Sequence, residues 1–219
     1  KLYYHKYMSS YSSLDEYRKA RNKPRCSYLV IDNFLNNPDE TREYILTQDF
    51  TVRGNYPGQR TLSYATEEMK NLIQKFLEPY AGKITQFKIG HDSQNENYNG
   101  AFQYTTSRDR SWIHTDGVNN WAGVLYLTPD APSSAGTGLF KHKSTGIVTQ
   151  DEMHLMDKAK LLGSHSQDYT KWELTDVIGN KYNRLILFDA RQHHASLDYF
   201  GTTKEDGRLF QTFFFSTEI

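Results

Sequence analysis

The chain has 219 residues, of which 14% are aromatic, and its 26 Lys and Arg residues balance 26 Asp and Glu residues. This length suffices for one substantial domain with a buried core, so we expect a single domain over residues 1–219. Zero formal net charge removes the simplest argument for binding to nucleic acid, which is therefore disfavoured as a partner. The single cysteine, Cys26, excludes an internal disulfide and a Cys-rich zinc site.

The apolar runs of the chain bear on its location. None approaches the roughly 18 apolar residues that read as a membrane-spanning helix. The first ten residues, KLYYHKYMSS, lack the apolar stretch of a signal peptide. We therefore expect a cytoplasmic protein with no membrane partner.

Residues 1–83 are expected to hold an N-terminal strand and helices. SSLDEYRKA (12–20) is compatible with a short helix, and CSYLVIDNFL (26–35) reads as a strand that runs into a turn. NNPDETREYILTQ (36–48) carries helix-start signals, since an asparagine suited to the N-cap, Asn37, precedes a proline and two acidic residues.

A second helix is expected in TEEMKNLIQKFLEP (66–79). Thr66 can cap its N-terminus, and Pro79 is expected to discourage its continuation. Its apolar residues recur at helical spacing and form one stripe: Met69, Leu72, Ile73, Phe76 and Leu77. Such a stripe needs a sheet or another helix to cover it.

From about residue 84 the apolar pattern changes to a period of two, which is typical of strands. Strand-like runs occupy residues 83–90, 100–106, 121–129, 138–142, 183–190 and 208–216. One helical segment, TQDEMHLMDKAKLL (149–162), interrupts them. We therefore expect an α+β fold with a mainly β core over residues 84–219, in which helices pack on a β-sandwich or jelly roll.

WIHTDGVNNW (112–121) is the first stretch that suggests chemistry. In a strand, His114 and Asp116 would point to the same face, because side chains alternate with a period of two. They could be two ligands of one metal ion or an ordinary polar surface pair. With 8 His and 26 acidic residues in 219, chance alone gives about one such spacing, so the motif depends on its context.

The context supplies further candidates. The apolar strand NRLILFDA leads into RQHHAS, which contains His193 and His194, and Arg208 follows His194 by 14 positions. Tyr104 lies ten positions before the first histidine of the motif. Two histidines and one carboxylate on one face of a metal form the facial triad of non-haem Fe(II) oxygenases. The other candidate ligands lack a partner at metal-ligand spacing and are expected on the surface or in loops: His91, His142, His154 and His165.

The order HTD…H…R, with the flanks GVLYLTPD, GTGLF and GRLFQTFFF, resembles the 2-oxoglutarate/Fe(II)-dependent oxygenases of the prolyl-4-hydroxylase-like superfamily. The resemblance covers most of the chain from about residue 84, and VIDNFLNNPDE resembles the opening of such domains. It implies a double-stranded β-helix, a distorted jelly roll, with the N-terminal helices packed on one sheet. It also implies Fe(II), 2-oxoglutarate as co-substrate and O₂.

By this resemblance, His114 and Asp116 would be the first two iron ligands. His194 would be the third, since LFDARQHHAS resembles the family's strand-then-His-x-Ser ending. His193 is the competing candidate, because a shift of one residue in strand register changes which imidazole faces inward.

The same resemblance assigns the co-substrate contacts. Arg208 would bind the distal carboxylate of 2-oxoglutarate, since a guanidinium offers paired donors that match a carboxylate. Tyr104 could donate a hydrogen bond to the same carboxylate. Many family members have Ser or Thr two residues after the arginine, where this chain has Phe210, and Thr212 on the same strand face is the candidate substitute.

The expected reaction is hydroxylation of an unactivated C–H bond, with release of succinate and CO₂. The substrate would be a peptidyl residue, an amino acid or a small metabolite, recognised by loops such as residues 91–100 and by the helical insert at 150–180. Two alternatives stay open at the level of the sequence. One is a cupin-like jelly-roll metalloprotein that does not use 2-oxoglutarate, and the other is a non-catalytic binding module.

Overall fold

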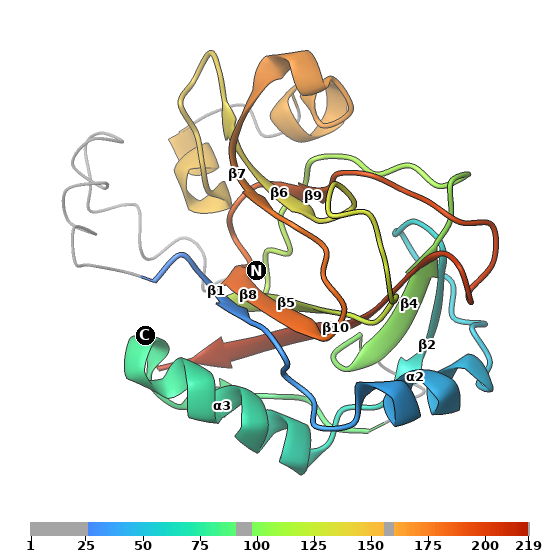
Figure 1. Cartoon of the computed structure of the whole chain (residues 1–219). Coiled ribbons are helices and arrows are strands. Elements are labelled where there is room, and N and C mark those ends of the chain that lie inside the picture. The colour runs from blue at the N-terminus through green and yellow to red at the C-terminus, as the bar shows by residue number, and fades with distance from the viewer. Residues whose placement is uncertain (1–25, 91–97, 156–159, 219) are drawn as a thin grey trace.

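The computed structural model describes residues 26–90, 98–155 and 160–218, which form two stacked antiparallel sheets with two helices on the outer side (Figure 1). The strand order of the major sheet is β1-β8-β5-β10-β4-β2, with β3 also paired to β10, and that of the minor sheet is β7-β6-β9. The major-sheet strands are β1 (Tyr28–Ile31), β2 (Gln59–Ser63), β3 (Ile84–Gln86), β4 (Ala101–Thr105), β5 (Trp121–Tyr126), β8 (Arg184–Asp189) and β10 (Arg208–Thr217). The minor-sheet strands are β6 (Thr137–His142), β7 (Trp172–Ile178) and β9 (His194–Ser196).

Most of the expected helices and strands are present, and the main difference lies in the insert between β6 and β8. The segment 149–162 contains a short 3₁₀-helix, η2 (Gln150–Leu155), and the start of a π-helical turn, η3 (Lys160–His165). The expectation of a helical insert over 150–180 is wrong in its last part, because after η4 (Tyr169–Lys171) the chain forms β7. The helix suggested at 12–20 lies outside the described residues.

The helix α2 (Pro38–Leu46) begins after Asn37, although the Asn37 side chain makes no capping bond. The helix α3 (Glu67–Ala81) is capped as expected, since the Thr66 hydroxyl accepts a hydrogen bond from the backbone N–H of Met69 at 3.1 Å. Pro79 does not end this helix, which continues to Ala81. Proline costs a helix one backbone hydrogen bond and a steric clash, and in the last turn few bonds remain to be lost.

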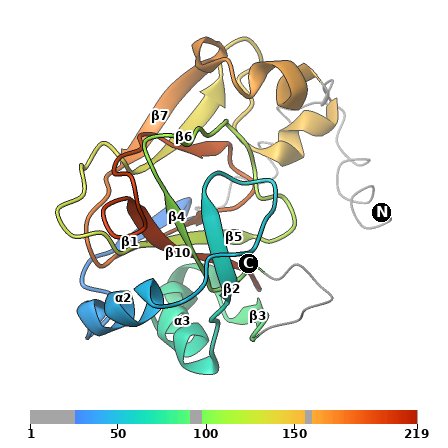
Figure 2. The same cartoon turned by 90° about the vertical axis from the view of Figure 1, so that its right-hand side faces the viewer.

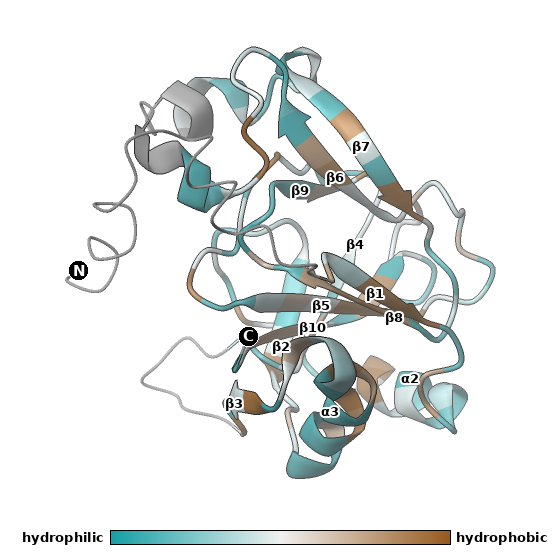
Figure 3. Ribbon diagram, turned by 90° about the vertical axis from the view of Figure 1, so that its left-hand side faces the viewer, coloured by the Kyte–Doolittle hydropathy of each residue, from teal (hydrophilic) through white to brown (hydrophobic). Residues whose placement is uncertain are grey.

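Both faces of the major sheet are buried. In β8, Leu185 and Leu187 face a core shared with α3, whereas Ile186 and Phe188 face the minor sheet. This arrangement explains why NRLILFDA is apolar throughout, because a strand covered on both faces has no polar alternation. Figure 2 shows α2 and α3 beneath the major sheet, and in Figure 3 the hydrophobic colour is concentrated in strands such as β8.

The expected fold class is confirmed: a mainly β chain with a double-stranded β-helix and N-terminal helices packed on one sheet. The strands β1 and β2 precede residue 84 and yet belong to the major sheet, which therefore includes strands from both sides of the expected division at residue 84. Among the helices of the described residues, none has the length and apolar character that crossing a membrane requires.

Candidate metal centre

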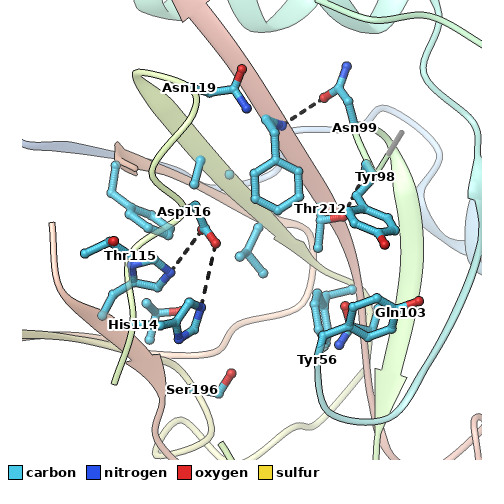
Figure 4. A pocket seen from close by; sticks show the side chains of 18 of the residues that line it. Tyr56, Tyr98, Asn99, Gln103, His114, Thr115, Asp116, Asn119, Ser196 and Thr212 are labelled. Carbon is cyan, nitrogen blue, oxygen red and sulfur yellow. Dashed lines mark hydrogen bonds and ion pairs between the residues drawn. The ribbon is translucent and has the colours of Figure 1, made fainter. Parts of the chain in front are cut away.

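Three side chains from two distant segments of the sequence meet between the sheets (Figure 4). One ligand atom from each of His114, Asp116 and His194 lies within 4.8 Å of the other two. The Asp116 carboxylate lies with Oδ2 3.1 Å from Nε2 of His194 and Oδ1 3.7 Å from Nε2 of His114. Two imidazole nitrogens and one carboxylate thus face a common point, as a facial triad requires.

Backbone hydrogen bonds hold the two histidines side by side. The N–H of His114 donates to the carbonyl of His194 at 3.0 Å, and the N–H of His194 donates back at 2.9 Å. The two imidazole centroids are consequently 4.4 Å apart. The N–H of Asp116 donates to the carbonyl of Ala190 at 2.8 Å, so the segment before β5 is fixed to both ends of the turn that precedes β9.

The second nitrogen of each imidazole fixes its tautomer. Nδ1 of His114 lies 2.9 Å from the carbonyl oxygen of Trp112, and Nδ1 of His194 lies 2.8 Å from that of Gln192. Since a carbonyl only accepts, Nδ1 carries a hydrogen in both rings, and Nε2 is the nitrogen that faces Asp116 and is placed to bind a metal ion. Such outer hydrogen bonds are the usual means by which proteins orient metal-binding histidines, so the residues fit a divalent ion.

The charges within the triad agree with this arrangement. Burial, aided by neighbouring His194, lowers the pKa of His114 and favours its neutral form. Burial alone would raise the pKa of Asp116, but the two imidazoles and Arg60 outweigh it and lower that pKa. The pKa of His194 is raised, because the Asp116 carboxylate outweighs the effect of burial. The carboxylate is therefore held ionised at the centre of the cluster.

His193 points away from this centre. Its Nδ1 lies 2.9 Å from the carbonyl oxygen of Val148, and its ring centroid lies 4.8 Å from that of Trp172. Burial lowers its pKa to about 4. Of the two adjacent histidines, the structure brings His194 to the other two ligands and leaves His193 in the packing behind the minor sheet.

The expectation that His142 lies on the surface or in a loop is wrong. It lies within β6 with 2% of its surface exposed, and its Nε2 is 3.0 Å from Nδ1 of His165. An inward position on a strand buries the ring, and the second imidazole supplies the hydrogen-bond partner that burial requires. His91 and the side chain of His154 lie outside the described residues.

The triad opens into a cavity of about 950 Å³ between the sheets. Arg208 and Thr212 line the same cavity, as do Phe210 and Phe214 from the same face of β10. The Thr212 hydroxyl lies 3.1 Å from the carbonyl oxygens of Tyr98 and Ala101, to which it donates.

Arg208 is a buried cation, with 1% of its surface exposed. Its Nε donates to the carbonyl of Ala135 at 2.9 Å, and its guanidinium carbon lies 4.4 Å from the ring centroid of Phe210 and 5.2 Å from that of Tyr126. Nη1 has no hydrogen-bond partner, and no acidic side chain pairs with this arginine, within the described part of the chain. A buried guanidinium without a counter-ion fits an anionic ligand.

The structure does not bring Tyr104 to the cavity. Tyr104 pairs with Leu209 in the register of β4 and β10, so it faces the helices, where its ring centroid lies 5.1 Å from that of Phe50. Gln103 pairs with Phe210, and both line the cavity. The sequence indicated a strand here, but the face of each residue depends on its register with β10.

Several residues of the cavity wall were not singled out in the sequence. Figure 4 shows Tyr56 and Gln103 across the cavity from His114 and Asp116, and Arg60, which also lines the cavity, donates to Gln103. No described residue of 150–180 lines the cavity. Tyr98, from the expected recognition loop 91–100, does line it. In the sequence, the feature that could have pointed to this wall is the basic residue Arg60 in the short segment QRTLS. That Arg60 faces the cavity follows from its pairing with Gln103 of β4.

Comparison with solved structures agrees with this geometry. HygX from Streptomyces hygroscopicus with nickel and 2-oxoglutarate bound is 10% identical, covers 94% of this chain and 88% of that chain, and has a TM-score of 0.57. The structure of HygX with nickel, 2-oxoglutarate and hygromycin B bound has a TM-score of 0.54 at the same identity and coverage. At this identity the likeness shows the fold, and with the triad it confirms the resemblance to 2-oxoglutarate/Fe(II) oxygenases.

Comparison of sequences gives the family. No curated protein sequence matches the chain. A family model described as a family of unknown function, DUF6445, matches residues 16–215, which is most of the chain and includes all three triad residues and Arg208. The chain belongs to this DUF6445 family.

Proposed function

We propose that this protein is an Fe(II)- and 2-oxoglutarate-dependent oxygenase that hydroxylates an unactivated C–H bond. One observation carries the proposal. A His–Asp–His triad with converging ligand atoms shares a cavity with Arg208, a buried guanidinium that has no acidic partner in the described residues. A metal site and an anion site in one cavity are what a metal-chelating dicarboxylate needs.

Each residue has a role in the proposed site. His114, Asp116 and His194 would hold iron through Nε2, a carboxylate oxygen and Nε2. Arg208 would bind the distal carboxylate of 2-oxoglutarate, and the buried position strengthens that ion pair because water is excluded. When bound, iron and 2-oxoglutarate supply the oxidising chemistry, in which O₂ and 2-oxoglutarate yield succinate, CO₂ and a hydroxylated substrate. The substrate would be a peptidyl residue, an amino acid or a small metabolite.

The test is release of succinate from purified protein with Fe(II), 2-oxoglutarate and air, measured first without a primary substrate. The wild-type chain is expected to form succinate, whereas Asp116→Ala is expected to form none. Arg208→Ala is expected to raise the KM for 2-oxoglutarate about 10- to 150-fold, since a charge-assisted hydrogen-bonded pair contributes about 1.5–3 kcal/mol.

Two results would contradict the proposal. One is a folded, metal-loaded wild-type protein that neither binds nor consumes 2-oxoglutarate. The other is unchanged 2-oxoglutarate turnover in Arg208→Ala, which would favour a jelly-roll metalloprotein of another class. Arg53→Gln serves as a control, because Arg53 is exposed and lies outside the cavity.

A further inference from the structure

A second buried guanidinium lies in the same cavity, on the wall opposite the metal centre. Arg60, on β2, has 6% of its surface exposed. Its guanidinium carbon lies 3.7 Å from the ring centroid of Tyr56 and 4.7 Å from that of Tyr98. The two tyrosine rings contact each other edge to face, with their centroids 5.6 Å apart. Aromatic contacts of this kind hold a guanidinium in place and leave its edges for hydrogen bonding.

One edge of the Arg60 guanidinium is already occupied by a neutral group. Nε and Nη2 donate to Oε1 of Gln103 at 2.8 and 2.5 Å. The Gln103 amide is oriented by its own Nε2, which donates to the carbonyl of Pro57 at 2.5 Å. Nη1 donates no hydrogen bond to a described residue. The outer edge, with Nη1 and the second hydrogen of Nη2, remains for a planar acceptor.

No acidic side chain of the described residues forms a direct ion pair with Arg60, and the cavity carboxylate that acts on it through space is Asp116, a candidate metal ligand. Its lining contains the cations Arg60, Lys88 and Arg208, and Asp116 is the one acidic residue among the described residues that line it. A divalent ion, the Asp116 carboxylate and Arg208 together carry two positive charges, which the two carboxylates of 2-oxoglutarate balance. Burial lowers the pKa of Arg60 only to about 10, so it stays charged at neutral pH. A largely buried guanidinium with no direct ion pair favours the binding of a further anion.

The relative positions of the metal centre and of the residues around Arg60 indicate how a ligand would lie in the cavity. Figure 4 shows Tyr56, Tyr98 and Gln103 across the cavity from His114 and Asp116. A molecule held at the Arg60 edge would therefore extend toward the metal centre. We propose that Arg60 is the specificity-determining anchor for a primary substrate that carries a carboxylate. This inference rests on the proposed oxygenase function and narrows its substrate to anionic small molecules or peptide ends.

The test uses a panel of monocarboxylates, each paired with its primary amide, because the pair differs in charge and little in shape. Binding is measured by calorimetry on protein loaded with Zn(II) and 2-oxoglutarate, which does not turn over. At least one carboxylate is expected to bind about tenfold or more tightly than its amide. This preference is expected to disappear in Arg60→Gln and to persist in the exposed control Arg53→Gln.

Arg60→Lys protects the test against a variant that fails to fold. Lysine keeps the charge but loses the planar paired donors, so a reduced preference for the carboxylate is expected. The proposal is overturned if no carboxylate binds more tightly than its amide, or if the preference survives in Arg60→Gln. It is also overturned if Arg60→Gln weakens 2-oxoglutarate binding as strongly as Arg208→Gln, because Arg60 would then belong to the co-substrate site.

Failure of the proposed function gives a different pattern. If 2-oxoglutarate does not bind to the wild-type protein, the oxygenase assignment fails whatever the panel shows. The carboxylate preference can still be measured on the protein loaded with Zn(II) alone, where its dependence on Arg60 is read separately.

Discussion

Two adjacent histidines have opposite environments. His194 directs Nε2 to Asp116, whereas His193 packs against Trp172 and bonds to the backbone of Val148. The separation follows from strand geometry, because consecutive side chains point to opposite faces. Although the two residues are adjacent in sequence, His194 is placed to bind a metal ion and His193 contributes to packing.

The difference predicts distinct effects of two alanine variants. His194→Ala should weaken Ni(II) or Zn(II) binding by more than about 100-fold, since loss of an outer hydrogen-bond partner already costs about 10- to 100-fold. His193→Ala should change metal affinity less than about tenfold. It should lower the free energy of unfolding by about 1–3 kcal/mol, because it removes a buried ring that packs against Trp172 and its side-chain hydrogen bond to the carbonyl of Val148. Calorimetric titration and chemical denaturation measure the two effects. A loss of metal binding in His193→Ala alone would show that the ligand is assigned to the wrong residue.

At the scale of elements, Asn183 connects the start of β8 with the segment that follows β1. Its side chain donates to the carbonyl of Leu35 and accepts from the N–H of Leu35, both at 2.8 Å. Its backbone carbonyl accepts from Phe34 and its φ is +58°, in the left-handed region. Asparagine is among the few side chains that tolerate this conformation.

Two substitutions of Asn183 are therefore expected to lower the free energy of unfolding by different amounts. Asn183→Gly keeps the backbone conformation but loses two hydrogen bonds, so the free energy of unfolding should fall by about 1–3 kcal/mol. Asn183→Ala should lose about 1 kcal/mol more, because a Cβ is strained at this φ. Denaturant titration of both variants measures the difference. Equal stability of the two variants would contradict the strain argument.

The turn that leads into β10 predicts a dependence on pH. The Asp206 carboxylate accepts from the backbone N–H of Thr202 at 2.8 Å and of Thr203 at 2.7 Å, which lowers the pKa of Asp206 to about 2. A lowered folded-state pKa stabilises the fold above the unfolded-state value near 4, and this contribution is lost as the pH falls toward 2. The stability difference between the wild type and Asp206→Asn should therefore shrink between about pH 4 and pH 2. Urea titrations at several pH values test this, and a difference that grows in acid would contradict it.

At the scale of the whole molecule, the triad takes its ligands from both sheets. His114 and Asp116 lie before β5 of the major sheet, and His194 begins β9 of the minor sheet. An ion bound to all three would connect the two sheets directly. Metal binding should therefore stabilise the entire fold and not only the site.

This link predicts a metal-dependent melting temperature. At a free Zn(II) concentration about 100 times Kd, linkage adds about 2.7 kcal/mol, which corresponds to a rise in Tm of about 5–11 °C for a chain of this size. A chelator should reverse the rise, and Asp116→Ala should abolish it. Calorimetric scans with and without chelator measure the effect. A similar rise in the Asp116→Ala variant would show that the ion binds elsewhere.

The sequence by itself determined what local pattern can encode. The 3.6-residue periodicity and the cap of α3, the period of two in the strands, and the same-face pair of His114 and Asp116 are properties of short segments. The order of motifs also pointed to the fold class and to an oxygenase-like site, both of which the structure matches.

Only the tertiary structure decided which faces of those segments meet. Strand register decides three placements. It brings His194 and not His193 to the metal centre, it turns Gln103 and not Tyr104 to the cavity, and it places Arg60 in the cavity lining. Register is fixed by pairing between segments far apart in the chain, and a shift of one residue turns a side chain from the cavity to the helices. No local pattern contains that information, because the partner strand supplies it.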